Sequence, residues 1–165
     1  MPHGVSGGKY PPEKQALYRL LKERLSALME GERNPLPNMA NMSALLFESL
    51  PQINWAGFYL AQGSELMLGP FQGKPACIRI PFGRGVCGAA AEQGTAQIVP
   101  DVLQFPGHIA CDAASRSEIV IPLEWDGRLL GVLDIDSAVP RRFDEEDRQG
   151  LEALAALLAS GCDWA

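Results

Sequence analysis

The sequence lacks the features that direct a chain to a membrane or to nucleic acid. It has no apolar run approaching the about 20 residues needed to span a bilayer. Its N-terminus lacks the charged, apolar and cleavage regions of a signal peptide. The 14 basic residues are scattered and are outnumbered by 20 acidic ones, so a net charge of −6 does not attract polyanions. We therefore expect a cytoplasmic protein that binds neither membrane nor nucleic acid.

Motifs for metals and phosphates are also missing. The chain has four cysteines and two histidines, and no two cysteines have the C-x-x-C spacing of zinc ribbons and thioredoxin-like redox sites. His108 and Cys111 could face one ion, but the only other histidine, His3, lies in a glycine-rich terminus. The glycine loop at 83–88 lacks the Gly-Lys-Ser/Thr ending of a P-loop. We expect no metal and no cofactor, and in a reducing compartment the cysteines indicate core packing, catalysis or transient disulfide chemistry.

Length and composition fit one globular domain. The chain has 165 residues, of which 47% are apolar and 21% charged, enough for a single core and little more. Residues 1–11 contain several glycines and prolines and are predicted to be a flexible extension. Residues 12–161 carry the periodic patterns of one domain, and 162–165 follow it as a C-terminal tail.

The order of these patterns predicts an α+β fold. Helical spacing of leucines predicts helices over 12–29, 38–50 and 144–160, with Asp144 as the N-cap of the last and Pro35 and Pro37 between the first two. Strands are predicted at 53–60, 65–71, 77–81, 95–99, 117–125 and 128–137, and a short helix at 83–92. Asp126-Gly127 is the strongest hairpin signal. An antiparallel sheet with helices mainly on one face is the expected packing.

The segment from His108 to Pro122 carries the clearest chemical signal. Cys111 lies in a polar loop that runs into an apolar strand, with His108, Asp112 and Ser115 close in sequence. Structural cysteines are usually buried among apolar residues, so these surroundings indicate a partly exposed, tuned thiol. The irregular segment 101–115 is also long for a compact domain, which is typical of a functional loop. The alternative is a loop cysteine with no chemistry.

Two strands add polar and aromatic groups. Alternation places Trp55 and Tyr59 on one face of the first strand, where they either line a pocket or are simply half-buried. In the last strand Asp134 and Asp136 share a face with Val132. Like charges in a half-buried position repel, so at least one of these carboxyls should have a raised pKa.

Taken together, these segments resemble the free methionine-(R)-sulfoxide reductases, which are single-domain GAF proteins, over about residues 15–158. The segments that carry the resemblance occur in the family's order; they are 54–59, 69–74, Cys77, 83–88, 108–115, 117–120 and 131–137. The thiol-bearing and acidic segments are specific to these reductases within the larger GAF group. The resemblance implies a GAF-like sheet with helices mainly on one face and a ligand pocket on the other.

The resemblance also implies roles for the cysteines. Cys111 corresponds to the catalytic cysteine, and Cys77 corresponds to the resolving one. Cys87 matches a further family cysteine, an alternative or auxiliary thiol, so the residues alone leave open which of Cys77 and Cys87 resolves. Cys162 lies outside the pattern.

The remaining matches concern the substrate. The acidic cluster that holds the substrate and assists at the sulfoxide corresponds to Glu118, Asp134 and Asp136, and the aromatic part of the pocket to Trp55 and Tyr59. The implied reaction converts free L-methionine-(R)-sulfoxide to methionine through a cysteine sulfenic acid and an intramolecular disulfide, which thioredoxin reduces. A homodimer is an assembly that the sequence leaves open. Sulfoxide reduction needs a thiolate and a proton donor, which Cys111 and the acids can supply.

Two other functions compete with this one. A non-catalytic GAF sensor would bind a cyclic nucleotide or another small ligand, since one fold hosts many functions. A redox sensor would form a regulatory disulfide between Cys77 and Cys111 without turnover. Release of methionine from the sulfoxide would exclude both.

Overall fold

A computed structural model describes residues 9–108 and 113–165. Its elements follow the order α1 (Lys14–Met29), α2 (Pro35–Ser49), β1 (Trp55–Gln62), β2 (Glu65–Gly73), β3 (Arg79–Pro81), α3 (Gly85–Gln93), β4 (Gln97–Val99), the 3₁₀ turn η2 (Val102–Gln104), β5 (Ser117–Trp125), β6 (Arg128–Ser137) and α4 (Glu145–Gly161). The six strands form one antiparallel sheet in the order β3-β2-β1-β6-β5-β4. Within residues 9–108 and 113–165, no helix has the length and apolar character that a bilayer span requires.

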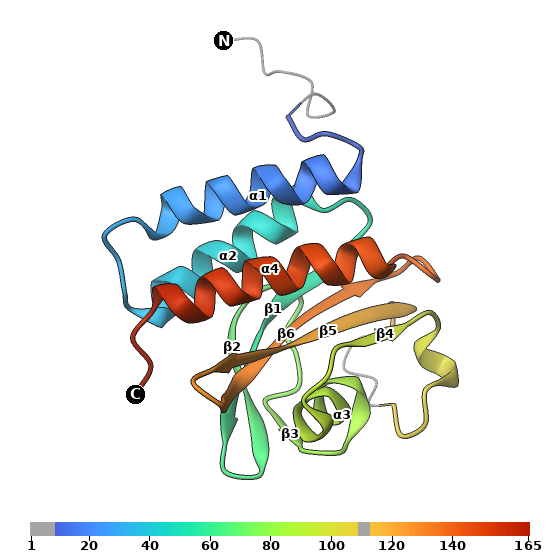
Figure 1. Ribbon diagram of the computed structural model, residues 1–165. Helices are drawn as coiled ribbons and strands as arrows, with labels where there is room; N and C mark the ends of the chain where they lie inside the picture. Colours follow the sequence, from blue (N-terminus) through green and yellow to red (C-terminus); the bar gives the residue numbers. More distant parts are fainter. Residues whose placement is uncertain (1–8, 109–112) are drawn as a thin grey trace.

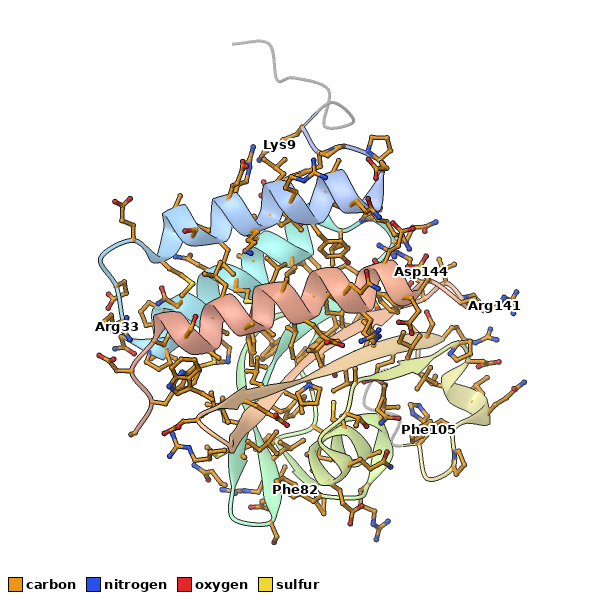
Figure 2. The ribbon with its side chains drawn as sticks, viewed as in Figure 1. Lys9, Arg33, Phe82, Phe105, Arg141 and Asp144 are labelled. Atoms are coloured by element: carbon orange, nitrogen blue, oxygen red, sulfur yellow. The ribbon has the colours of Figure 1, made fainter. Side chains whose placement is uncertain are left out.

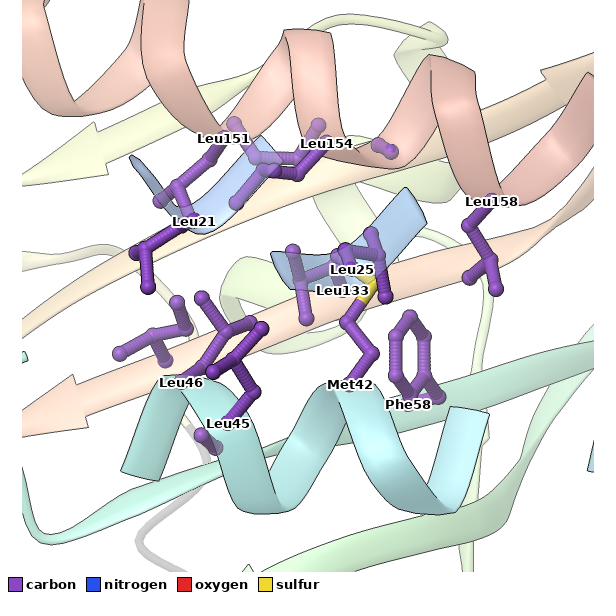
Figure 3. Packing of buried hydrophobic residues seen from close by; sticks show 14 of the residues in the cluster. Leu21, Leu25, Met42, Leu45, Leu46, Phe58, Leu133, Leu151, Leu154 and Leu158 are labelled. Carbon is purple, nitrogen blue, oxygen red and sulfur yellow. The ribbon is translucent and has the colours of Figure 1, made fainter. Parts of the chain in front are cut away.

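The helices divide between the two faces of the sheet. Figure 1 shows α2 and α4 against one face, with α1 packed outside them, and α3 on the other face. The larger core lies under α1, α2 and α4, and contains Leu25, Met42, Phe58, Leu133 and Leu154 among others (Figure 3). The predicted α+β arrangement, with helices mainly on one face, is confirmed.

A second, smaller core lies on the α3 side of the sheet. It contains Trp55, Tyr59 and Val132, and Phe82 and Phe105 pack at its margin (Figure 2). Ala56 and Phe58 of β1 belong to the opposite core. The predicted alternation of β1 and β6 is therefore confirmed, and it directs one aromatic and acidic set of side chains toward α3.

The predicted start of the second helix is wrong. α2 begins at Pro35 rather than at residue 38, and the Asn34 side chain caps it by accepting a hydrogen bond from Leu36 N at 3.0 Å. Pro35 and Pro37 both lie in the first turn, where an N–H has no helical acceptor, so neither proline costs the helix a hydrogen bond. The first strand and the short strands β3 and β4 also begin two residues later than predicted.

The β5–β6 hairpin matches its predicted bounds. Asp126 and Gly127 have positive φ of 54° and 72°, as a type I′ turn requires. The register shifts by one residue between Leu123 and Glu124, because an extra residue in β6 forms a bulge. Beyond the bulge Gly131 faces β1 so closely that a Cβ would lie 2.1 Å from Tyr59 O.

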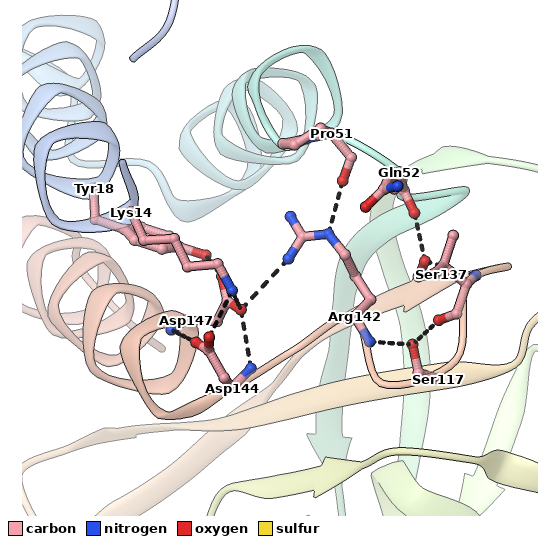
Figure 4. A network of polar contacts seen from close by, with 10 residues as sticks. Lys14, Tyr18, Pro51, Gln52, Ser117, Ser137, Arg142, Asp144 and Asp147 are labelled. Atoms are coloured by element: carbon pink, nitrogen blue, oxygen red, sulfur yellow. Dashed lines mark hydrogen bonds and ion pairs between the residues drawn. The ribbon is translucent and has the colours of Figure 1, made fainter. Parts of the chain in front are cut away.

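A buried carboxylate joins two helices of the helical layer (Figure 4). Asp147 is 1% exposed, and it accepts hydrogen bonds from Lys14 Nζ and Tyr18 Oη of α1, each at 2.7 Å. Asp144 and Asp147 also form a reciprocal capping box at the start of α4. The predicted cap at Asp144 is confirmed, and Asp147 joins α1 to α4 as well.

The chain ends were predicted as a flexible extension over 1–11 and a tail over 162–165. Residues 1–8 of that extension lie outside the described residues. Lys9 Nζ and Tyr10 Oη each donate to the Glu48 carboxylate, at 2.7 and 2.8 Å. At the other end Trp164 Nε1 donates to Ala159 O at 2.8 Å, and Cys162 is buried. The residues next to the domain therefore pack on it.

Candidate active site

A cavity of about 50 Å³ opens on the α3 side of the sheet. Its walls come from β1, β5, β6, the start of α3 and the segment before β3. The lining includes Trp55, Tyr59, Cys87, Glu118, Asp134 and Asp136, all predicted site residues. The predicted pocket on the face away from the main helices is therefore confirmed.

Strand register brings the acids together. Glu118 lies directly opposite Asp136 in the β5–β6 pair, and Trp55 lies opposite Asp136 in the β1–β6 pair. Directly opposed residues of antiparallel strands point to the same face, so the three side chains form a row across the sheet. Asp134 lies on the same face two residues earlier in β6, opposite Val120 and Gly57.

Two of the acids are buried, and their ionised forms are disfavoured. Glu118 and Asp134 are 7% and 5% exposed. Burial, together with the charges of Asp134 and Asp136, raises the pKa of the Glu118 carboxyl well above its ordinary value. Burial also raises the pKa of Asp134, although hydrogen bonds from Glu118 and Cys87 oppose that rise. The expected raised pKa in the Asp134/Asp136 pair thus occurs at Asp134, and Glu118 shares it.

One oxygen of this cluster is a hydrogen-bond acceptor that the described residues leave unused. Asp134 Oδ1 is buried and has no hydrogen-bond partner among the described residues. An unpaired buried carboxylate oxygen costs free energy unless a donor reaches it. The cavity beside it gives such a donor a place to bind.

Cys87 belongs to the acid cluster. Its thiol is 4% exposed and lies 3.8 Å from Glu118 Oε2, to which it donates. Burial, followed by the charges of Asp134 and Glu118, raises the pKa of the Cys87 thiol well above its ordinary value. This environment favours the thiol over the thiolate, so Cys87 is held as a hydrogen-bond donor.

Among the described residues, Cys87, Glu118 and Asp134 form a group that could bind a metal ion. One ligand atom from each of Cys87, Glu118 and Asp134 lies within 4.8 Å of the other two. The hydrogen bond from Cys87 to Glu118 accounts for their proximity without an ion.

The aromatic residues do more than line the cavity. Trp55 stacks on Tyr59 and Phe71, with ring centroids 5.9 and 5.1 Å apart. Trp55 Nε1 donates to Lys74 O at 3.1 Å, and Tyr59 Oη donates to Cys77 O at 2.9 Å. Both rings therefore anchor the segment that carries Cys77 to β1, a role that sequence reasoning missed because nothing in the pattern places 74–77 over β1.

The cysteines are in different states. Cys77 is disulfide-bonded, while Cys87 and Cys162 are free thiols. Cys162 is buried between α2 and α4, where Asn38 Nδ2 lies 3.3 Å from its sulfur. Cys111, predicted to be the catalytic cysteine, lies outside the described residues.

The loop around Cys111 is fixed at both of its described ends. Val102 N donates to Arg116 O at 2.8 Å, and Arg116 N donates to Ser137 O at 2.7 Å. His108 on one side and Ser115 on the other line the cavity. Described residues on both sides of 109–112 in the predicted functional loop thus border the site.

Comparison with known proteins agrees with this geometry. The GAF domain model matches residues 38–161, so the chain belongs to the GAF domain family. A free methionine-R-sulfoxide reductase of Escherichia coli is 57% identical over 145 residues, which cover 88% of each chain. At this identity the chain belongs, within the GAF family, to the free methionine-R-sulfoxide reductases.

Solved structures of relatives support the same assignment. The free methionine-R-sulfoxide reductase of Neisseria meningitidis, solved in complex with its substrate, is 46% identical, with a TM-score of 0.88 over 92% of this chain and 91% of that one. The substrate complex of fRMsr of Staphylococcus aureus is 50% identical, with a TM-score of 0.85 over 88% of this chain and 95% of that one. The fold and family implied by the sequence are confirmed.

The raised pKa of Glu118 predicts a pH-dependent stability. The folded chain keeps the Glu118 proton above about pH 4.3, where the unfolded chain loses it, so wild-type stability falls as pH rises from there toward the folded pKa. Glu118→Gln has no proton to lose. Urea unfolding of both proteins at several pH values should give a stability difference in favour of Glu118→Gln that opens above about pH 4 and is absent below it.

Glu124→Gln is the matched control, since Glu124 is exposed on the same strand. It should follow the wild-type pH dependence. A Glu118→Gln protein whose unfolding free energy runs parallel to wild type at all pH values would contradict the assigned shift.

Proposed function

We propose that this chain reduces free L-methionine-(R)-sulfoxide to L-methionine with its own cysteines, and that it does so in the cytoplasm. The observation that carries the proposal is the cluster of the buried Glu118 and Asp134 with the half-buried Asp136, which shares one cavity with an aromatic stack beside the disulfide-bonded Cys77. The named activity of its relatives supports the choice of substrate. Each part of a free amino-acid sulfoxide has a matching group in this cavity.

The substrate ammonium matches the acid cluster. Asp134 Oδ1 is a buried acceptor without a partner among the described residues, and Asp136 adds a second, half-buried carboxylate. A charge-assisted hydrogen bond from an ammonium would give this oxygen a partner and would reduce the repulsion between the acids. An N-blocked or peptide-bound residue has no ammonium and would leave this cost in place.

The substrate carboxylate matches the start of α3. Gly85, Val86 and Cys87 form its first turn and line the cavity together with Arg84. First-turn N–H groups lack helical acceptors and carry partial positive charge, so they bind anions. The sulfoxide methyl has Trp55 as an apolar aromatic surface, which sulfur groups favour.

The chemistry that follows is a two-electron exchange between sulfurs. The Cys111 thiolate attacks the sulfoxide sulfur while a carboxylic acid protonates the sulfoxide oxygen, and the resulting hydroxyl group passes to the Cys111 sulfur as its bond to the substrate sulfur breaks. Methionine is released, and Cys111 becomes a sulfenic acid. We assign the proton to Glu118, because burial and neighbouring charges both hold it on this carboxyl.

A second thiol completes the cycle. The Cys77 thiol condenses with the sulfenic acid, which releases water and forms a disulfide. Support for Cys77 comes from its disulfide-bonded state, whereas Cys87 and Cys162 are free thiols. The buried Cys87, with its raised pKa, fits the role of an auxiliary donor to Glu118. An external dithiol such as thioredoxin then reduces the disulfide.

Substrate selectivity tests the function. Methionine release should be measured from free methionine-R-sulfoxide, free S-sulfoxide and an N-blocked R-sulfoxide, each with a thioredoxin recycling system. We expect turnover of the free R form only, and loss of turnover in Cys111→Ser. No release from any of the three would leave a GAF protein of a different function, and a ligand sensor would become the hypothesis to test.

Single-turnover stoichiometry tests the thiol roles. Without reductant, wild type and Cys77→Ser should each release one methionine per chain, but only wild type should resume when thioredoxin is added. Cys87→Ser keeps a hydrogen-bond donor and should continue to turn over. Multiple turnovers with thioredoxin in Cys77→Ser would reject Cys77 as the sole resolving thiol.

A further inference from the structure

Three buried ligand groups meet on the cavity side of the sheet, each from a different element. Cys87 lies in the first turn of α3, Glu118 in β5 and Asp134 in β6, and α3 packs beside both strands (Figure 1). The three residues are 4%, 7% and 5% exposed, in that order. Ligands that come from three separate elements leave no spacing motif, so the lack of a metal motif in the sequence does not exclude a site here.

The donor atoms are close enough to bind one ion. Cys87 Sγ lies 3.8 Å from Glu118 Oε2, and one ligand atom from each of the three residues lies within 4.8 Å of the other two. In a tetrahedral zinc site, with bonds of about 2.0 Å to oxygen and about 2.3 Å to sulfur, the ligand atoms are about 3.3–3.5 Å apart. Side-chain movements of at most about 1.5 Å would therefore complete the set.

Asp134 gives an independent indication of a cation. The hydrogen bond from Cys87 explains why the thiol and Glu118 are adjacent, but it does not involve Asp134 Oδ1. That oxygen is buried beside the cavity and has no hydrogen-bond partner among the described residues. Buried carboxylates are normally paired or coordinate a metal, and the half-buried Asp136 adds a further negative charge on the same face. A divalent cation would satisfy the oxygen and reduce this charge.

The donor set selects Zn²⁺ over the commoner Mg²⁺ and Ca²⁺. A thiolate is a soft ligand that suits zinc, whereas Mg²⁺ and Ca²⁺ take octahedral or larger sets of oxygen ligands. Three protein ligands also leave the fourth tetrahedral position for an exchangeable ligand, as in zinc sites that are open to solvent. The cavity gives the ion and that ligand access to the site.

We propose that Cys87, Glu118 and Asp134 bind one Zn²⁺ ion, and that this ion inhibits the enzyme by occupying groups that the substrate needs. The protons of the thiol and of the Glu118 carboxyl pass to solvent as the sulfur and the oxygen coordinate the ion. Asp134 then cannot accept from the substrate ammonium, and Glu118 has no proton for the substrate oxygen. The inhibition rests on the proposed function, whereas the binding does not.

Co²⁺, a spectroscopic substitute for Zn²⁺, tests the binding in the oxidised protein, whose Cys77 is disulfide-bonded. Thiolate-bound Co²⁺ has a charge-transfer band in the near ultraviolet. We expect this band to saturate at one ion per chain and to disappear when Zn²⁺ replaces Co²⁺. Cys87→Ser should lose the band and should bind Zn²⁺ at least about tenfold more weakly in competition with a chromophoric chelator.

The matched control is Cys162→Ser, because Cys162 is a second buried free thiol in the larger core on the other face of the sheet. It should keep both the band and the affinity. Asp134→Asn keeps the thiol and removes one charged ligand, so it should also weaken Zn²⁺ binding at least about tenfold. It decides the question if circular dichroism shows that Cys87→Ser is unfolded. No binding to wild type, a band that persists in folded Cys87→Ser, or unchanged affinity in Asp134→Asn would overturn the proposal.

Methionine release in a single turnover of the reduced protein tests the inhibition, without thioredoxin, whose thiols also bind Zn²⁺. The Zn²⁺ concentration for half-inhibition should rise with the sulfoxide concentration, since both ligands compete for the same groups. Relative to its own zinc-free rate, Cys87→Ser should need at least about tenfold more Zn²⁺ than wild type. Equal sensitivity of the two proteins would refute the inhibition. No methionine release even without Zn²⁺ would overturn the proposed function and with it the inhibition, while the Co²⁺ spectra still decide the binding.

Discussion

The candidate active site depends on the burial of Glu118 and Asp134 beside Asp136 on one face of an antiparallel sheet. Three carboxyls this close cannot all ionise in a site that excludes water, so the cluster retains a proton that isolated acids would have lost. The cost of this arrangement is offset by the rest of the fold. It also gives the site a carboxyl with a raised pKa beside a carboxylate acceptor, which are the groups that the proposed reduction of a free amino-acid sulfoxide requires.

The two faces of the sheet divide stability from chemistry. On one face α1, α2 and α4 enclose a large apolar core, and Asp147 ties α1 to α4 with hydrogen bonds from Lys14 and Tyr18. On the other face a smaller core of aromatic and aliphatic residues surrounds the acids. Because side chains alternate along β1 and β6, one strand serves both purposes: Phe58 and Leu133 stabilise the domain, while Trp55 and Asp134 shape the site.

Most of the architecture follows from periodicity in the sequence, since long amphipathic helices and the Asp126-Gly127 hairpin have strong local signals. The β-bulge does not. If the strands are paired by counting back from the two-residue turn, Glu118 lies opposite Ile135 and points toward the helical core. The bulge before Gly131 shifts the pairing by one residue, so Glu118 instead lies opposite Asp136. The contacts of Trp55 and Tyr59 with the 74–77 segment are equally non-local. The roles proposed for Cys77 and Cys87 draw on burial and bonding state, which spacing alone cannot supply, and the role proposed for Cys111 comes from the resemblance to family members.

The central claim is that Glu118 has a pKa well above its ordinary value and, in the proposed reaction, gives its proton to the substrate oxygen. The most direct measurement is an NMR titration of the Glu side-chain carboxyl carbons in the substrate-free protein, with Glu118 assigned by its absence in Glu118→Gln. We predict that the Glu118 signal titrates at a pH well above the ordinary value of about 4.3. A Glu118 signal that titrates near that ordinary value would contradict this account of the acid cluster.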